Sequence, residues 1–186
     1  LTRFLDYFLI YTKSVRTRKK QFALLLMLLL LALLATPSQA FAKGPVQSGP
    51  SVVDVALEIN TQTGEFSTLI AAAVCTNLVV PLDRKPGVTV FAPTDAAFAE
   101  LGLDASNVCN IPRHTLSNIL RYHIVINRAL LSGDVVASDT IRMANGQLTD
   151  ISVTDDGVFI NDAQIIVVDV VAANGIIHVI DGVLLP

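Results

Sequence analysis

The residues of this chain that could do chemistry are few and lie far apart in the sequence. Three histidines and two cysteines stand among scattered Asp and Glu residues, and His178 lies three positions before Asp181 in the run ANGIIHVIDGVLLP, residues 173–186. A His–Asp pair can act as a general base only when the two side chains meet. Because side chains alternate along a strand, a strand here puts His178 on the face of Ile176 and Ile180 and turns Asp181 the other way. We therefore expect His178 to be a buried polar group that stabilises the fold, not a reactive base.

The other polar residues match no pattern typical of an active site, a metal site or a phosphate loop. The G-x-S-x-G motif of serine hydrolases is absent, and Ser132-Gly133-Asp134 is typical of a turn. His114 and His123 are nine residues apart, which places them on opposite faces of one helix. No Gly-rich phosphate-binding motif occurs, and the carboxylates are not paired. The sequence thus predicts no catalytic residue, no metal and no cofactor, and we expect the protein not to be an enzyme.

Cys75 and Cys109 leave two possibilities open. An even number of cysteines in an oxidising compartment favours one disulfide, and the alternative is a pair of buried thiols. The spacing of 34 residues, with no neighbouring histidine, is not typical of a zinc site. A disulfide closing a loop of about 35 residues would contribute roughly 4 kcal/mol by the chain-entropy model.

Residues 1–42 have the three parts of a secretory signal peptide. A basic stretch ends at Lys20, an apolar run of 14 residues covers Phe22–Ala35, and Ala40-Phe41-Ala42 is a small-x-small cleavage site. The alternative is an uncleaved membrane anchor, but a membrane span needs about 20 apolar residues. We therefore expect the protein to be secreted, whether extracellular, periplasmic or at the cell surface, with membrane contact only through an uncleaved signal anchor.

Removal of residues 1–42 leaves a distinctly acidic protein. Seven basic and 15 acidic residues remain, which is a net charge of −8. Nucleic-acid binding requires a cluster of basic residues to meet phosphates, and none remains, so nucleic acid is not an expected partner. The same charge favours solubility and repels anionic lipid.

Helices are predicted in the first part of the mature chain. Residues 43–50 form a Gly/Pro/Ser-rich linker, and residues 51–186 are long enough for one domain. Ser51 and Asp54 resemble a capping box that starts a helix over residues 52–59, which NTQTGE is expected to end. A second helix has one apolar face, made by Phe66, Leu69, Ile70, Ala73 and Val74. Both helices are amphipathic and need a partner surface.

A strand followed by a helix is predicted at residues 88–102, VTVFAPTDAAFAELG. Pro93 ends the strand, Thr94 is a suitable N-cap, and Asp95 suits the positive end of the helix dipole. Gly102 is a natural C-cap. A further helix begins near Pro112, with one face formed by Leu116, Ile119, Leu120 and His123.

From about Ile124 the chain predicts short strands separated by Asn-Gly and Asp-Gly turns. The strands are expected at residues 140–143, 147–154, 158–161, 163–171 and 176–184. Helices first and strands later, without alternation of the two, predict an α+β domain with a largely antiparallel sheet.

Three segments of the chain resemble the fasciclin domain family. TVFAPTDAAFAELG at residues 89–102 is similar to the first homology box, Tyr122-His123 matches the family's Tyr-His pair, and residues 173–186 are similar to the second box. The resemblance extends from about Ser51 to the end of the chain. It implies a wedge-shaped β-sheet fold with N-terminal helices packed on it. The fold-defining positions are then Thr94, Asp95, Asn174, Gly175 and His178.

The resemblance also implies a function. Members of the family are secreted or surface modules for adhesion, so the implied partner is an extracellular protein or polysaccharide on a cell surface or in a matrix. Tyr122 and His123 match the pair implicated in cell contact, and the alternative is that both rings pack beneath the sheet. Asp169 and Val170 stand where animal members have an Asp-Ile element implicated in integrin contact.

Two further inferences rest on the same resemblance. The cysteines flank the first box as in many single-domain bacterial members, which favours the disulfide. Some fasciclin-like proteins bind carotenoids, so the alternative function is an extracellular carrier of an apolar small ligand such as a carotenoid or lipid.

Overall fold

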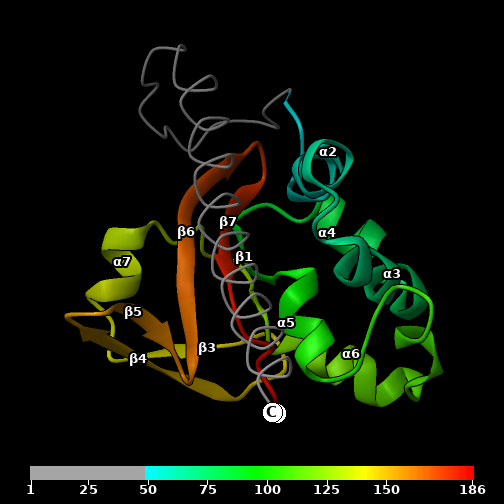
Figure 1. Cartoon of the computed structure of the whole chain (residues 1–186). Coiled ribbons are helices and arrows are strands. Elements are labelled where there is room, and N and C mark those ends of the chain that lie inside the picture. Colours follow the sequence, from blue (N-terminus) through cyan, green and yellow to red (C-terminus); the bar gives the residue numbers. More distant parts are fainter. Residues whose placement is uncertain (1–48) are drawn as a thin grey trace, which may run out of the picture. The chain divides into compact units, whose positions relative to one another are not determined.

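The computed structural model describes residues 49–186. The signal peptide predicted over residues 1–42, and most of the linker predicted over residues 43–50, lie outside the described residues. The described part is a seven-stranded sheet with several helices beside it (Figure 1). Its helices are α2 (Val52–Thr63), α3 (Ser67–Thr76), α4 (Val79–Arg84), α5 (Asp95–Glu100), the 3-10 helix η1 (Val108–Asn110), α6 (Arg113–Arg121) and α7 (Ser132–Val136).

The strands follow the order β2-β1-β7-β6-β5-β4-β3 across the sheet. Only β1 and β7 pair in parallel, and the other neighbours are antiparallel, so the predicted α+β class with a largely antiparallel sheet is confirmed. The bounds of the strands are β1 (Val88–Pro93), β2 (Ile124–Val125), β3 (Thr140–Arg142), β4 (Leu148–Thr154), β5 (Gly157–Ile160), β6 (Ala163–Ala172) and β7 (Gly175–Ile180).

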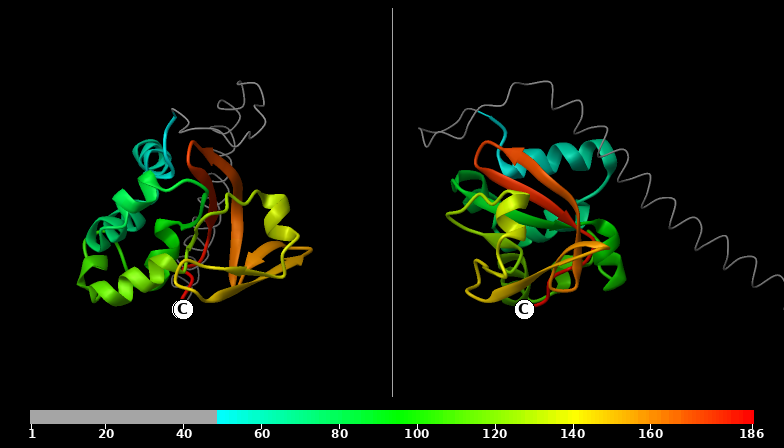
Figure 2. Two further views of the ribbon diagram at one scale, coloured as in Figure 1. Left: turned by 180° about the vertical axis from the view of Figure 1, so that it is seen from behind. Right: turned by 90° about the vertical axis from the view of Figure 1, so that its left-hand side faces the viewer.

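β7 is the centre of the fold. It lies between β1 and β6, and all six of its residues are buried. Helices α2 to α6 gather on one side of this central part of the sheet, and α7 lies beyond β6 on the other side (Figures 1 and 2). Because both faces of β7 are covered, its sequence GIIHVI is nearly continuous in apolar residues instead of alternating.

The last strand is shorter than predicted. The sequence suggested a strand to residue 184, but β7 ends at Ile180. Beyond it the chain bonds to side chains and to other segments. The Asp181 carboxylate accepts a hydrogen bond from the Gln164 N–H at 2.8 Å, and the Leu184 N–H donates to a ring nitrogen of His123 at 2.9 Å.

The first helix is longer than predicted. The capping box of Ser51 and Asp54 is confirmed, but NTQT continues the helix to Thr63 instead of ending it. The hydroxyls of Thr61 and Thr63 donate to carbonyls one turn back, at 2.9 and 2.7 Å, so these residues are satisfied inside a helix. The helix ends at Gly64, whose φ of 76° is a conformation that glycine adopts without strain.

Three short helices, α4, η1 and α7, were not predicted. Pro81 lies in the first turn of α4, where its missing N–H is not needed. Ser132-Gly133-Asp134, predicted as a turn, forms the first turn of α7 instead. The Leu131 N–H donates to the Asp134 carboxylate at 3.1 Å, which holds the start of this helix.

Asp95 has a wider role than the sequence indicated. Thr94 is the N-cap of α5, as predicted, because its hydroxyl accepts from the Ala97 N–H at 3.2 Å. Asp95 stands in the first turn of α5, yet its carboxylate accepts from the N–H groups of Ser67 and Thr68, at 3.1 and 2.8 Å, at the start of α3. One carboxylate therefore fixes two helices to each other.

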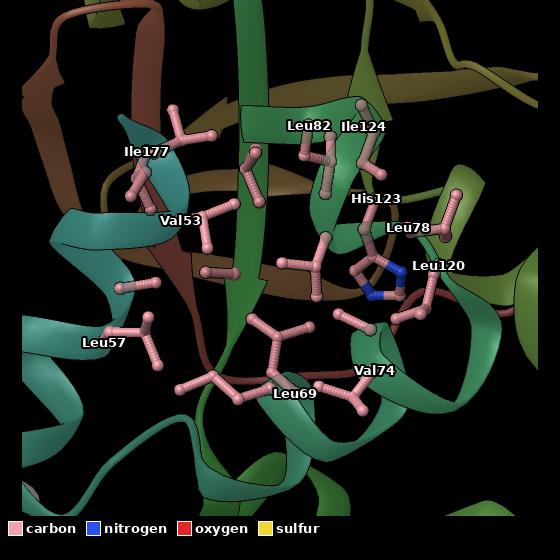
Figure 3. A pocket seen from close by; sticks show the side chains of 17 residues that line it. Val53, Leu57, Leu69, Val74, Leu78, Leu82, Leu120, His123, Ile124 and Ile177 are labelled. Atoms are coloured by element: carbon pink, nitrogen blue, oxygen red, sulfur yellow. The ribbon is translucent and has the colours of Figure 1, made fainter. Parts of the chain in front are cut away.

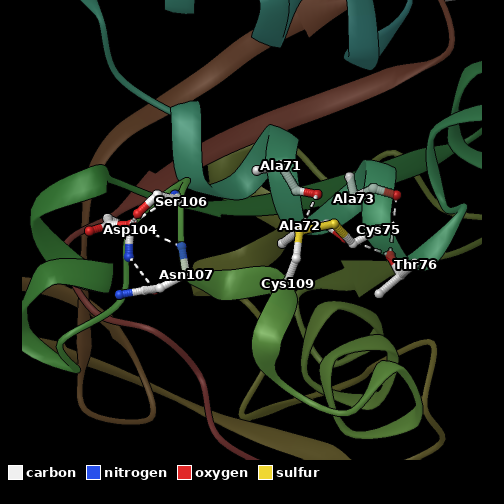
Figure 4. The surroundings of a disulfide bond; sticks show 9 residues. All are labelled: Ala71, Ala72, Ala73, Cys75, Thr76, Asp104, Ser106, Asn107 and Cys109. Carbon is white, nitrogen blue, oxygen red and sulfur yellow. Dashed lines mark hydrogen bonds between the residues drawn. A yellow bond between two sulfur atoms is a disulfide. The ribbon is translucent and has the colours of Figure 1, made fainter.

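Cys75 and Cys109 are joined in a disulfide (Figure 4). Their Cα atoms are 5.9 Å apart, and the bond links α3 to η1 across 34 residues of sequence. The alternative of two buried thiols is therefore excluded. Beside the bond, the Thr76 hydroxyl donates to the Ala72 carbonyl at 2.8 Å. The disulfide fixes the far end of the helix whose start is held by Asp95.

The close approach of β7 to β1 at Gly175 predicts that adding a single methyl group there destabilises the fold. A Cβ at Gly175 would lie 2.0 Å from the Val88 carbonyl oxygen, which belongs to the paired backbone. We expect Gly175→Ala to lower the free energy of unfolding by at least about 3 kcal/mol, measured by urea denaturation. Gly133→Ala is the matched control, because its Cβ would meet nothing within 4 Å and α7 gains a better helix former. Equal stability of the two variants would contradict this account.

Candidate functional site

His178 is a structural link at the centre of the sheet. Its ring is fully buried and stacks on Phe91, with the ring centroids 5.4 Å apart. Nδ1 accepts from the Asp169 N–H at 3.3 Å, so Nε2 carries the proton and donates to the Leu130 carbonyl at 2.9 Å. Burial lowers the pKa of His178, against smaller opposing effects of Leu130 and Asp169. The Asp181 carboxylate is bonded to the Gln164 N–H and not to the His178 ring, so His178 and Asp181 do not form a catalytic pair.

Tyr122 and His123 also lie inside the fold, with 6% and 1% of their surface exposed. The Tyr122 hydroxyl donates to the Leu148 carbonyl at 2.9 Å. His123 Nδ1 donates to the Ile119 carbonyl and Nε2 accepts from the Leu184 N–H, both at 2.9 Å. In this arrangement the pair joins the end of α6 to β4 and to the C-terminal segment.

Asp169 and Val170 lie where β6 departs from regular pairing. Asp169 has a φ of 59°, and the register shifts between Val167 and Val170. The Asp169 carboxylate accepts from the Ser132 N–H at 2.7 Å and from the Ser132 hydroxyl, which fixes α7 to the sheet. Val170 is 5% exposed. Neither side chain is free at the surface.

Asn174 connects the β6–β7 turn to two helices. Its Oδ1 accepts from the Val52 N–H at 2.8 Å, at the start of α2. Its Nδ2 donates to the Leu82 carbonyl at 2.7 Å and to two further carbonyls at 3.1 Å, at the end of α4. The Asn-Gly pair predicted the turn, but these partners lie about 90 to 120 residues away and leave no local signal in the sequence.

An apolar pocket lies between these helices and the sheet (Figure 3). Its volume is about 160 Å³, and of the 17 residues that line it all but His123 have apolar side chains. The wall is formed by helices α2, α3 and α4, by strands β1 and β7, and by the end of α6. Typical members are Ala56, Leu69, Ala73, Leu82, Val90 and Ile177.

The pocket explains the apolar face predicted on α3. Leu69, Ile70, Ala73 and Val74 all line the pocket, whereas the buried residues of the helix are Thr68, Ala72 and Thr76. Val74 remains 57% exposed, and Leu57 on α2 remains 44% exposed. The face that periodicity marked as needing a partner is therefore incompletely covered within the described residues.

The pocket offers a ligand no free polar atom. His123 is the single polar side chain in its wall, and both ring nitrogens are already bonded to backbone groups. Throughout residues 49–186 no buried side-chain nitrogen or oxygen lacks a partner. Any occupant of the pocket must therefore be apolar where it is enclosed.

Between residues 49 and 186, no three His, Cys, Asp or Glu side chains are grouped so that they could hold a metal ion. None of the helices in this same range has the length and the apolar character needed to cross a bilayer.

The burial of His123 predicts a pH dependence of stability. Burial lowers the pKa of His123 from 6.5 to about 4, against a smaller opposing effect of the hydrogen bond to the Ile119 carbonyl. The folded state therefore gains stability from the neutral His123 in full above about pH 6.5. This contribution to the free energy of unfolding, roughly 3 kcal/mol, is lost as the pH falls from there through about 4. We expect urea denaturation at a series of pH values to show that the free energy of unfolding decreases more steeply with falling pH for the native chain than for His123→Gln. The Gln side chain keeps a donor and an acceptor. Parallel pH curves would contradict this assignment.

Comparison with known proteins identifies the fold and the family. The fasciclin domain model matches residues 64–186. Protein sll1735 of Synechocystis sp. is 39% identical over 138 residues, which cover 73% of this chain and 98% of that protein. Transforming growth factor-beta-induced protein ig-h3 of Sus scrofa is 35% identical over 121 residues, 65% of this chain but 18% of that protein.

A solved structure agrees with this relationship. The FAS1 domain pair of the insect cell adhesion molecule fasciclin I is similar with a TM-score of 0.60 and 20% identity, over 74% of this chain and 51% of that one. At this identity the likeness concerns the fold alone. Taken with the family model and the relatives, these comparisons show that the chain belongs to the fasciclin domain family.

Proposed function

We propose that the protein is a secreted or surface-associated adhesion module that binds an extracellular protein or polysaccharide and has no catalytic activity. The observation that carries this proposal is the use of the motif residues. The polar atoms of these side chains form hydrogen bonds inside the fold, as seen for His178, His123, Tyr122 and Asp169. The homology boxes thus build a scaffold, and function is left to the surface.

Four further features support this function. The fold is that of a domain from an insect cell adhesion molecule, and the chain has a disulfide, which persists in oxidising compartments. The predicted signal peptide would direct the chain to such a compartment. The excess of acidic residues outside residues 1–42 favours a basic partner and disfavours anionic lipid.

Adhesion is tested with the chain recovered after export from its host and immobilised on a plate. We expect it to retain host cells or their surface material several-fold above the Gly175→Ala chain when both are assayed at a temperature at which the variant is unfolded and the native chain is folded. Because the chain is acidic, retention should decrease as the salt concentration rises. Equal retention by the two chains would exclude the folded module as the adhesive element.

Transport of an apolar small molecule is a second candidate, and the pocket is the observation that favours it. This function requires the exported protein to carry about one equivalent of a ligand, since a ligand pocket buries most of the surface of its ligand. Extraction of the purified protein with organic solvent, followed by absorption and mass spectrometry, measures that equivalent. Protein that yields no apolar molecule would exclude the carrier.

A further inference from the structure

We propose that the pocket between α2, α3 and α4 binds one apolar anchor side chain, phenylalanine or leucine, from a basic segment of a protein partner. This inference rests on the proposed adhesive function and names the chemistry of its partner. The occupant is decided by three properties of the pocket: its volume, its lack of free polar atoms and the charge around it.

The volume fits one side chain. An apolar cavity of about 150 Å³ binds a single benzene ring, whereas pockets for drug-sized ligands have about 300–1,000 Å³. At about 160 Å³ this pocket encloses one phenyl ring or one branched aliphatic group. A long polyene or a lipid would leave most of its length in water. Protein interfaces commonly place one buried apolar residue in a pocket of this kind.

The wall selects the type of side chain. Both nitrogens of His123 are bonded to backbone groups, so an enclosed hydroxyl or indole N–H would have no partner. Enclosing such a group without a partner costs about 1–3 kcal/mol. Phenylalanine is therefore preferred over tyrosine, although the two rings have nearly the same shape.

The mouth of the pocket provides the remaining contact. Leu57 on α2 and Val74 on α3 line the pocket and stay 44% and 57% exposed. Apolar side chains around an anchor exclude water from it and strengthen the contact.

The charges near the pocket indicate the charge of the partner segment. The charged residues of α2 are Asp54 and Glu58, both acidic and exposed, and each follows a pocket-lining residue in the sequence. Helix α3 has no charged residue, and α4 carries one acidic and one basic residue, Asp83 and Arg84, so the three helices together have three acidic residues and one basic residue. Over residues 49–186 there are 15 acidic and six basic residues. Basic residues beside the anchor would meet this field favourably, whereas an anionic membrane surface would be repelled.

The test uses short capped peptides as probes. The reference peptide is acetyl-Lys-Lys-Phe-Lys-Lys-amide, and the comparison peptides replace Phe with Tyr or Ser, or all Lys with Glu. Binding to the exported chain is followed by the methyl NMR signals of Leu57, Leu69 and Val74. We expect the Phe peptide to shift these signals with at least about tenfold higher affinity than each comparison peptide. Equal affinities, or shifts elsewhere only, would overturn the proposal.

Matched variants connect the pocket to adhesion. Ala73→Phe fills the pocket, and Ala99→Phe makes the same change at an exposed site on α5. We expect Ala73→Phe to lose peptide binding and host-cell retention, and Ala99→Phe to keep both. If Ala73→Phe does not fold, Val74→Lys at the exposed rim replaces it, since it repels the basic peptide without filling the interior.

The outcomes separate this inference from the proposed function. Full retention of host cells by a folded pocket variant would overturn the anchor pocket and leave the adhesive function standing. Absence of retention by the native chain would overturn the adhesive function itself. Phosphatidylcholine vesicles or an extracted lipid that displaced the Phe peptide would overturn the protein partner in favour of the carrier.

Discussion

The contact between β7 and β1 at Gly175 is the constraint on which the rest of the structure depends. The parallel pair places the backbone of Val88 where no side chain could stand, so the position has to be glycine. Asn174, one residue earlier, is thereby fixed in the turn between β6 and β7, and its amide holds the start of α2 and the end of α4. Two of the helices that enclose the pocket, α2 and α4, are therefore positioned by the turn that leads into the central strand, whereas α3 is held by Asp95 and the disulfide.

The buried polar residues follow from the same constraint. A strand covered on both faces leaves its neighbours with backbone groups that water cannot reach. His178 and His123 supply one donor and one acceptor each, and they satisfy the groups at Leu130, Asp169, Ile119 and Leu184. Neutral imidazole suits this task because it offers both roles in one rigid ring. The two histidines that could have suggested catalysis are thus fully used by the fold.

The sequence predicted the elements better than their relations. Hydrophobic alternation and Asn-Gly or Asp-Gly turns located β3 to β6 closely, because those signals are local. Short α4 and α7 were missed, since Pro81 and Gly133 are weak helix signals. The parallel pairing of β1 with β7, the reach of Asp95 to α3 and that of Asn174 to α2 depend on residues far apart in the chain. Periodicity found the apolar face of α3 but could not show that it borders a pocket, because a pattern does not reveal what covers a face.

The place of β7 also has a mechanical consequence for the domain. β7 is the last strand, it lies in the interior of the sheet, and it runs directly into the C-terminal segment. A pull on that segment meets the Leu184–His123 bond first and then the hydrogen bonds that join β7 to β1 on one side and to β6 on the other. These bonds then share the load and must break together, in shear, instead of one after another as at a free edge. The strand that organises the interior is thus also the element best placed to resist tension.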